Sequence, residues 1–182
     1  GSNEIIFQNI MVGDVWLCGG QSNMDFDLSR YLKVPGGIGE QYTEIVAGRA
    51  SYKDLRVVLM KVVGTTPTSD VPVMDDKVFH GKWQGCPKEV TPRMSAVGFG
   101  FALRLQQHLG VPVGLIDANK GGSPIGTWHS PHSLKAKGYT REGRNLYNGM
   151  IGCYKDFPVK GFIWYQGESN ARTVEQAFEY EK

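Results

Sequence analysis

The stretch MVGDVWLCGGQSNM, residues 11–24, decides the fold class. It begins with the short apolar run from Met11 to Cys18, which is typical of a buried strand. Gly19 and Gly20 end that run in a predicted tight turn, and the residues that follow favour the start of a helix. A strand that leads directly into a helix is the repeating unit of α/β folds, so we expect the same alternation further along the chain.

Three more apolar runs meet that expectation: LRVVLMKVV at 55–63, VPVGLI at 111–116 and VKGFIWY at 159–165. The clearest helix spans 94–109, because apolar residues recur there every four positions and Gly110 follows. The predicted apolar stripe consists of Val97, Phe101, Leu105 and Leu109, and Ala102 and Leu103 widen it. Continuous apolar strands need cover on both faces, so we predict a three-layer α/β/α fold with a parallel sheet.

Weaker signals suggest further elements. Ser123 and Pro124 resemble a helix start, with serine as the cap and proline at the first position. Helices are also predicted at 141–156 and 173–182, while the proline-rich stretch 65–92 is predicted to be a long surface excursion. Short strands are expected within it around Phe79 and Trp83.

Composition excludes several classes of function. The chain has 182 residues with 20 Lys+Arg and 18 Asp+Glu, and this near balance gives no reason to expect a nucleic-acid or membrane-surface partner. No apolar run approaches the ~20 residues that cross a bilayer. Cys18, Cys86 and Cys153 are too far apart for a metal motif and allow one disulfide at most, so isolated buried thiols are favoured. We expect neither a metal nor a cofactor.

The unusual loops all follow predicted strands: GGQSN at 19–23, NKGGS at 119–123 and QGESN at 166–170. Carboxyl ends of parallel strands meet at one edge of a sheet, and binding sites of α/β proteins collect there. Each loop taken alone also has an ordinary interpretation, since serine caps helices, a glycine pair forms turns, and Asn and Ser are common in loops. Their convergence is what predicts an active site.

Three segments in the same order resemble the conserved blocks of SGNH/GDSL-type hydrolases in their sialate O-acetylesterase form. They are GDVWLCGGQSNM at 13–24, GLIDANKGGSPIGTW at 114–128 and GFIWYQGESN at 161–170. The resemblance implies that Ser22 is the nucleophile of an esterase that removes O-acetyl groups from sialic acids or related sugars. It also implies oxyanion donors at the backbone N–H groups of Ser22 and Gly122, and a third donor at the Gln166 side chain, with Asn170 as the alternative. Lys120 stands where that family usually has tryptophan, which affects the substrate-facing wall.

The same resemblance implies a base that the chain does not show. Such esterases take it from an Asp-x-x-His pair near the C-terminus, and none of the four histidines (His80, His108, His129 and His132) follows an aspartate at that spacing. We therefore expect residues 11–182 to form a hydrolase core without its acid–base segment, and residues 1–10 to lead in from a further N-terminal region. A C-terminal fragment or another chain would supply the base, and this chain alone would be inactive.

Two alternatives remain at this stage. The chain could be a non-catalytic carbohydrate-binding remnant of the same fold, or an esterase of the acetyl-xylan type. A phosphate-binding function is not supported, because neither glycine cluster has the spacing of a phosphate-binding loop. The resemblance favours a secreted, periplasmic or lysosomal location.

Overall fold

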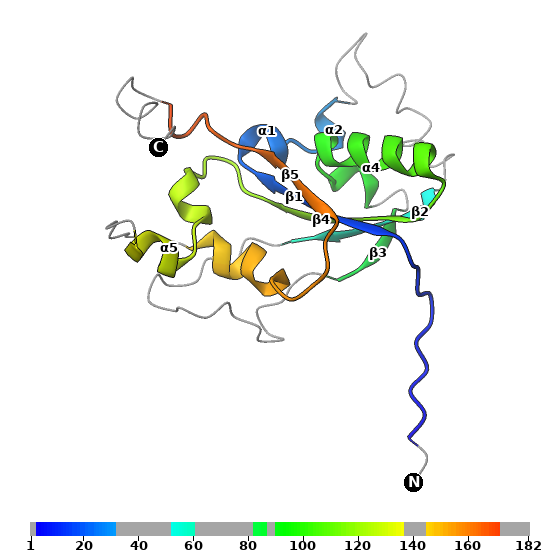
Figure 1. The fold of residues 1–182 in the computed structure, drawn as a ribbon. Coiled ribbons are helices and arrows are strands. Elements are labelled where there is room, and N and C mark those ends of the chain that lie inside the picture. Colours follow the sequence, from blue (N-terminus) through cyan, green and yellow to red (C-terminus); the bar gives the residue numbers. More distant parts are fainter. Residues whose placement is uncertain (1–2, 32–51, 61–81, 87–89, 137–144, 172–182) are drawn as a thin grey trace.

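A five-stranded sheet with the order β3-β2-β4-β1-β5 forms the centre of the structure (Figure 1). This computed structural model describes residues 3–31, 52–60, 82–86, 90–136 and 145–171. The strands are β1 (Asp14–Gly20), β2 (Tyr52–Leu59), β3 (Gln84–Cys86), β4 (Val113–Asn119) and β5 (Gly161–Tyr165). Helical segments cover both faces of this sheet, so the predicted α/β class with three layers is confirmed.

Four of the five strands run parallel, as predicted. β1 pairs in parallel with β4 and β5, and β2 pairs in parallel with β4. The exception is the edge strand β3, which is antiparallel to β2. It lies where a short strand was expected near Trp83, but a strand of three residues carries no signal of its direction in the sequence.

The strands at the centre of the sheet end later than their apolar runs. Gly20 still pairs with Asn119 on one side and with Tyr165 on the other, so the predicted tight turn at Gly19–Gly20 is wrong. Backbone hydrogen bonds, rather than side-chain hydrophobicity, decide where a strand ends, and glycine pairs as well as valine does. The extension carries the polar loops to a common edge.

The helix α4 (Ala96–Leu109) has the predicted C-terminal end, begins two residues later than predicted, and buries only part of the predicted apolar stripe. The Ser95 hydroxyl accepts the Gly98 N–H at 3.0 Å, and Gly110 ends the helix in the left-handed conformation with a φ of 66°. Gly98, Phe99, Ala102 and Leu103 are the buried residues. Ala102 and Leu103 of the predicted stripe are buried, whereas Val97 and Leu109 are 36% and 44% exposed. A Cβ added at Gly98 would lie 2.8 Å from Cys18 Sγ, so the helix packs closely against the sheet at this position.

The first face of the sheet carries α1 (Ser22–Asp25), α2 (Leu28–Tyr31) and α4. Its buried cluster includes Cys18, Met24, Phe99 and Leu115. The 3-10 turn η1 (Thr91–Arg93) precedes α4.

The second face carries η2 (Ile125–Trp128), α5 (Pro131–Ala136), η3 (Tyr147–Ile151) and η4 (Gly152–Tyr154). Its cluster includes Leu17, Ile116, Trp128 and Met150. Two faces with separate cores are what a sheet of apolar strands requires.

Several weaker predictions are corrected or lie outside the described residues. Pro124 precedes a 3-10 turn instead of starting an α-helix, and the Ser123 side chain is not a cap: it donates to the Lys120 carbonyl at 2.7 Å. The described part of 141–156 forms the short η3 and η4 segments. The predicted helix at 173–182, the expected strand around Phe79 and most of 65–92 lie outside the described residues.

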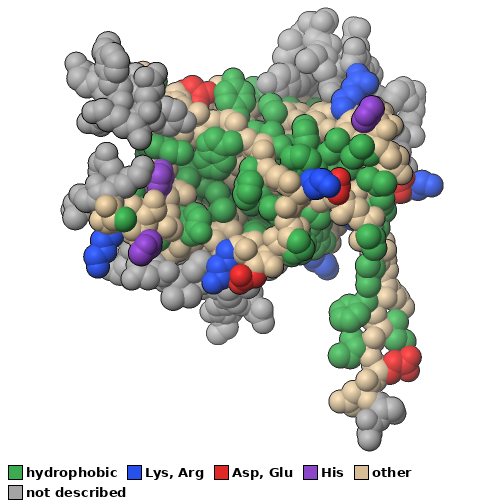
Figure 2. All heavy atoms as spheres, in the orientation of Figure 1, with side chains coloured by type: hydrophobic (Ala, Val, Ile, Leu, Met, Phe, Trp, Pro, Cys, Tyr) green, Lys and Arg blue, Asp and Glu red, His purple; other side chains and the backbone are tan. Residues whose placement is uncertain are grey.

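The structure shows the surroundings of the three cysteines and the course of the N-terminal segment. Cys18, Cys86 and Cys153 are buried and free, as favoured from the sequence. Residues 3–8 extend away from the sheet and are exposed (Figures 1 and 2), whereas Asn9 contacts Arg56 of β2. Among the described residues, no helix combines the length and apolar character needed to cross a membrane.

Asp117 joins the sheet to the start of α4. Its side chain is buried, and Oδ2 accepts the Ser95 N–H at 2.7 Å, while Oδ1 accepts from the Asn119 amide. Burial raises the pKa of Asp117 to about 7, although the hydrogen bonds from Ser95 and Asn119 oppose that shift. The nearby Asp25 carboxylate adds to the shift. This carboxyl group is thus protonated in the folded chain at a pH where it would ionise in water.

The raised pKa predicts a loss of stability as the pH rises. Between pH ~4 and ~7 the unfolded chain has Asp117 ionised while the folded chain keeps it protonated, so Asp117 lowers the free energy of unfolding by up to about 4 kcal/mol across this window. Asp117→Asn keeps an acceptor for the Ser95 N–H and should remove that pH dependence. Urea unfolding at pH 4.5 and 7.5 measures it, with Asp156→Asn, whose side chain is exposed, as the control. An unchanged pH dependence in Asp117→Asn would contradict the assignment.

Candidate active site

The three predicted loops lie side by side at the carboxyl edge of the sheet. Backbone hydrogen bonds continue the strand pairing into them: the Lys120 N–H donates to Gly20 O, and the Gln21 N–H donates to Tyr165 O, both at 3.0 Å. The loop after β1 is therefore fixed between the loops after β4 and β5. This is the arrangement that the position of β1 in the strand order requires.

Ser22 is the first residue of α1 and is exposed at this edge. Gln21 occupies the cap position of that helix, and no side-chain hydrogen bond caps it. The ordinary interpretation of Ser22 as a helix cap is therefore wrong. Among the residues that the structure describes, its hydroxyl has one hydrogen-bond contact, with the Gln21 Nε2 atom at 3.4 Å, and the hydroxyl accepts in this contact. The hydroxyl hydrogen therefore stays available to a base.

Gln21 connects the first loop to the third. It is 2% exposed, and its Oε1 atom accepts the Ser169 N–H at 3.0 Å and the Gln166 Nε2 at 3.2 Å. Sequence reasoning quoted this residue within the motif but assigned it no role. The sequence feature that could have indicated a role for Gln21 is its place beside Ser22, in a loop whose other positions are glycine or small polar residues. A buried side-chain amide there holds the Gln166 loop at a fixed position relative to Ser22.

The second loop is held beside Ser22 by Asp25. The Gly121 N–H donates to Asp25 Oδ2 at 2.8 Å, and a side chain added at Gly121 would begin 3.9 Å from the Ser22 Cα atom. Gly122 has a φ of 74°, a backbone conformation that residues other than glycine rarely adopt. A Cβ added at Gly122 would have no atom of the described residues within 4 Å. The loop thus presents backbone to an open side next to Ser22.

The amides of the third loop have different surroundings. Gln166 Nε2 contacts three acceptors: Asn170 Oδ1 at 2.8 Å, and Gln21 Oε1 and Ser123 O, each at 3.2 Å. Asn170 Oδ1 also accepts the Ile125 N–H at 2.7 Å. A backbone N–H can only donate, so this contact fixes the orientation of the Asn170 amide. Among the described residues, its Nδ2 atom has no protein acceptor.

The structure therefore brings Ser22, Gly122, Gln166 and Asn170 to one edge of the sheet. In the described part of the chain, none of the histidines hydrogen-bonds to the Ser22 hydroxyl; His129 Nδ1 lies 3.4 Å from Ser133 Oγ instead. His108 lies at the opposite end of α4, and His80 falls outside the described residues. No group of three or more potential metal ligands occurs among the residues that the structure describes.

Comparison with known proteins identifies the family. The model of the carbohydrate esterase family described as sialic acid-specific acetylesterase matches residues 12–182, nearly the whole chain. The chain belongs to this family. Members that resemble it include the sialate O-acetylesterases of Pongo abelii, 32% identical over 181 residues, and Homo sapiens, 30% identical over 176 residues. Each match covers 89% of this chain, and the chain spans about a third of each relative's length (32%).

Solved structures support the membership of the sialic acid-specific acetylesterase family. A carbohydrate acetylesterase from Xanthomonas citri superposes with a TM-score of 0.69 at 35% identity, covering 91% of this chain and 36% of its own. A protein from Arabidopsis thaliana superposes with a TM-score of 0.53 over 92% of this chain and 62% of its own, at 17% identity, and this likeness shows the fold alone. The family and the fold inferred from the sequence motifs are thereby confirmed.

Proposed function

We propose that this chain forms the part of a carbohydrate O-acetylesterase that carries the nucleophile and the oxyanion site. The observation that supports this most is the placement of Ser22 between a backbone loop held by Asp25 and an amide loop held by Gln21. A hydroxyl with donors on both sides is what attack on an ester carbonyl needs. The substrate class, an O-acetylated sugar and foremost an O-acetylated sialic acid, follows from the names of the relatives.

The reaction would proceed in two steps. Ser22 Oγ forms a bond to the acetyl carbon as a base takes its proton, and the carbonyl oxygen becomes an oxyanion that accepts from the Ser22 and Gly122 N–H groups. The C–O bond to the sugar then breaks, and the sugar oxygen leaves with the proton from the base. Water attacks the acetyl-enzyme in the same way and releases acetate and free Ser22.

For the third oxyanion donor we propose Asn170, with Gln166 as the residue that positions it. Gln166 already shares its two N–H groups among three acceptors, so an oxyanion would have to displace one of them. The Asn170 Nδ2 atom can donate without breaking a contact within the described residues. One such donor typically contributes about 3 kcal/mol to transition-state stabilisation.

The base would be an Asp-x-x-His pair contributed from outside residues 1–182, as the resemblance implies. The greater length of the relatives leaves room for such a segment. The same proposal makes residues 11–182 the hydrolase core and residues 1–10 a lead-in from another region.

Acetate release tests the proposal. The chain is assayed alone and extended after Lys182 by the C-terminal part of the Xanthomonas citri relative, with O-acetylated sialic acid and acetylated xylan as substrates. We expect negligible release by the chain alone, turnover by the extended protein, and a preference for the sialic acid ester. Turnover by the chain alone would place the base within it. Sugar binding by the extended protein without acetate release would support a non-catalytic carbohydrate-binding role instead.

A further inference from the structure

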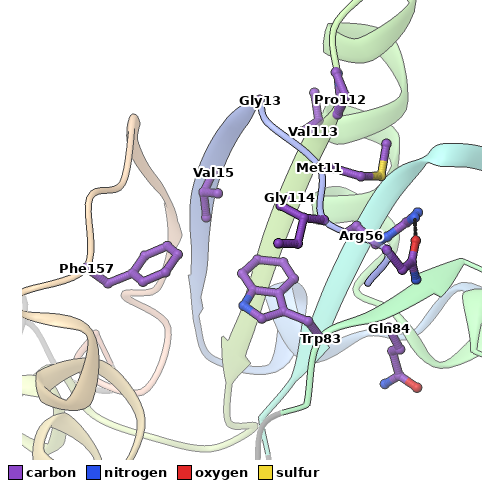
Figure 3. A pocket seen from close by; sticks show the side chains of 12 residues that line it. Met11, Gly13, Val15, Arg56, Trp83, Gln84, Pro112, Val113, Gly114 and Phe157 are labelled. Carbon is purple, nitrogen blue, oxygen red and sulfur yellow. Dashed lines mark hydrogen bonds between the residues drawn. The ribbon is translucent and has the colours of Figure 1, made fainter. Parts of the chain in front are cut away.

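A cavity of about 290 Å³ opens at the opposite edge of the sheet, where the strands begin (Figure 3). Residues at the starts of β1 and β4 line it, together with the N-terminal segment around Asn9 and with Phe157. A strand of seven residues separates this edge from Ser22, so the two sites are roughly 20 Å apart. The cavity is no part of the proposed active site.

The floor of this cavity is a part of the sheet where one position, Gly114, has no side chain. Val15, Gly114 and Arg56 are neighbours in register across β1, β4 and β2, so their side-chain positions share one face. Gly114, in the middle, has no side chain, and the Trp83 indole covers it: a Cβ added there would lie 3.0 Å from the Trp83 ring. The row therefore presents a flat aromatic surface between an apolar and a charged side chain.

Two aromatic rings face the opening. The Trp83 and Phe157 ring centroids are 6.3 Å apart with an interplanar angle of 32°, and the two residues are 37% and 39% exposed. Aromatic faces carry partial negative charge and attract the weakly positive C–H groups that one face of a sugar ring presents. The Gln84 and Asn9 amides in the lining can both donate to and accept from hydroxyl groups.

Arg56 gives the cavity a fixed positive charge. Its Nη1 atom donates to Lys53 O at 2.6 Å and Leu55 O at 3.0 Å, and Nη2 donates to Asn9 Oδ1 at 2.9 Å. All three acceptors are neutral, and no salt bridge joins Arg56 to a carboxylate in the described part of the chain. A guanidinium has five N–H groups, so it retains donors for an anion, and its planar form suits a carboxylate.

We infer that this cavity binds a sugar that carries a carboxylate, with the ring against Trp83 and the carboxylate near Arg56. The site would hold an acidic glycan on the enzyme without taking part in ester cleavage. Aromatic walls with a few fixed polar groups are typical of small-ligand sites. The inference is independent of the proposed reaction, because binding here requires neither Ser22 nor a base.

Nuclear magnetic resonance of the 182-residue chain tests this, with the Trp83 indole N–H as the reporter, assigned with Trp83→Phe. The probes are N-acetylneuraminic acid and glucuronic acid, compared with glucose, a neutral sugar, and with acetate, a carboxylate without a ring. We expect the acidic sugars to shift the Trp83 signal with a Kd near ~1 mM, and glucose and acetate to bind at least ~10-fold more weakly.

Variants locate the interaction. Arg56→Gln should weaken the acidic sugars at least ~10-fold, to the level of glucose. Lys82→Gln removes the same charge from an exposed neighbour of Trp83 that does not line the cavity, and it should have no effect, as should Ser22→Ala. If Arg56→Gln does not fold, Arg56→Lys, which keeps the charge without the planar fork, must weaken binding instead.

Several results would overturn the inference. One is the absence of a Trp83 shift with both acidic sugars. Another is an equal affinity for acetate, which would leave the ring without a role. Equal losses in Arg56→Gln and Lys82→Gln would show general charge attraction rather than a site.

Discussion

Ser22→Ala should abolish covalent labelling by a fluorophosphonate in the chain extended with an Asp-x-x-His segment, lowering the rate at least ~10³-fold. The hydroxyl is exposed, is not used as a helix cap, and within the described ranges has one weak contact, with Gln21 Nε2 at 3.4 Å. Removing it takes away the hydroxyl that lies between the two donor loops. Mass spectrometry of the labelled protein measures the loss and identifies the modified residue.

A matched control for this experiment is Ser133→Ala. Ser133 is the serine whose hydroxyl lies 3.4 Å from a histidine nitrogen, that of His129, and could be mistaken for the nucleophile. Ser133 lies in α5, on the second face of the sheet. The Ser133→Ala variant should be labelled as fast as the protein with Ser133. Labelling that survives in Ser22→Ala and disappears in Ser133→Ala would refute the assignment of the nucleophile.

The second large effect is expected at Asn170. Asn170→Asp keeps the oxygen that accepts from Ile125 and Gln166 but replaces the Nδ2 donor by a carboxylate oxygen. A negative charge beside the developing oxyanion should lower kcat by ~10²–10³-fold, with the melting temperature nearly unchanged. Acetate release and thermal unfolding of the extended protein measure the two quantities.

Gln166→Glu is the informative comparison. It places a carboxylate against three acceptor oxygens, those of Gln21, Ser123 and Asn170, and should therefore destabilise the third loop and lower the melting temperature. If Gln166→Glu instead removed activity at full stability while Asn170→Asp stayed active, Gln166 would be the oxyanion donor.

Much of the fold could be predicted because its signals are local. Apolar runs located four of the strands, and apolar periodicity with Gly110 located α4 and its C-terminal end. The edge-strand direction and the exact strand ends could not be predicted, because backbone pairing with distant residues decides them. The buried face of α4 was predicted only in part, because contact with the sheet decides it: Gly98 lies close to Cys18 and Leu115, and Phe99 beside it is fully buried.

The candidate site shows the same division. The motifs around Ser22, Gly122 and Gln166 identified the three loops, and parallel topology predicted that they meet. The contacts that hold them together, from Gln21 to Ser169 and from Asp25 to Gly121, join residues about a hundred or more positions apart. No periodicity or spacing in one sequence signals such a pair. The distinction between Gln166 and Asn170 likewise depends on contacts within the folded chain, because it rests on which side-chain amide already donates to protein acceptors.

The central claim is that donors from three loops surround one carbonyl oxygen at Ser22. A crystal structure of the extended protein with Ser22 phosphonylated measures this directly, because the phosphonyl oxygen stands in for the oxyanion. The account predicts that this oxygen lies about 2.7–3.2 Å from the Ser22 N, Gly122 N and Asn170 Nδ2 atoms. An adduct whose oxygen points to solvent, beyond hydrogen-bond distance of Gly122 and of both amides, would contradict it.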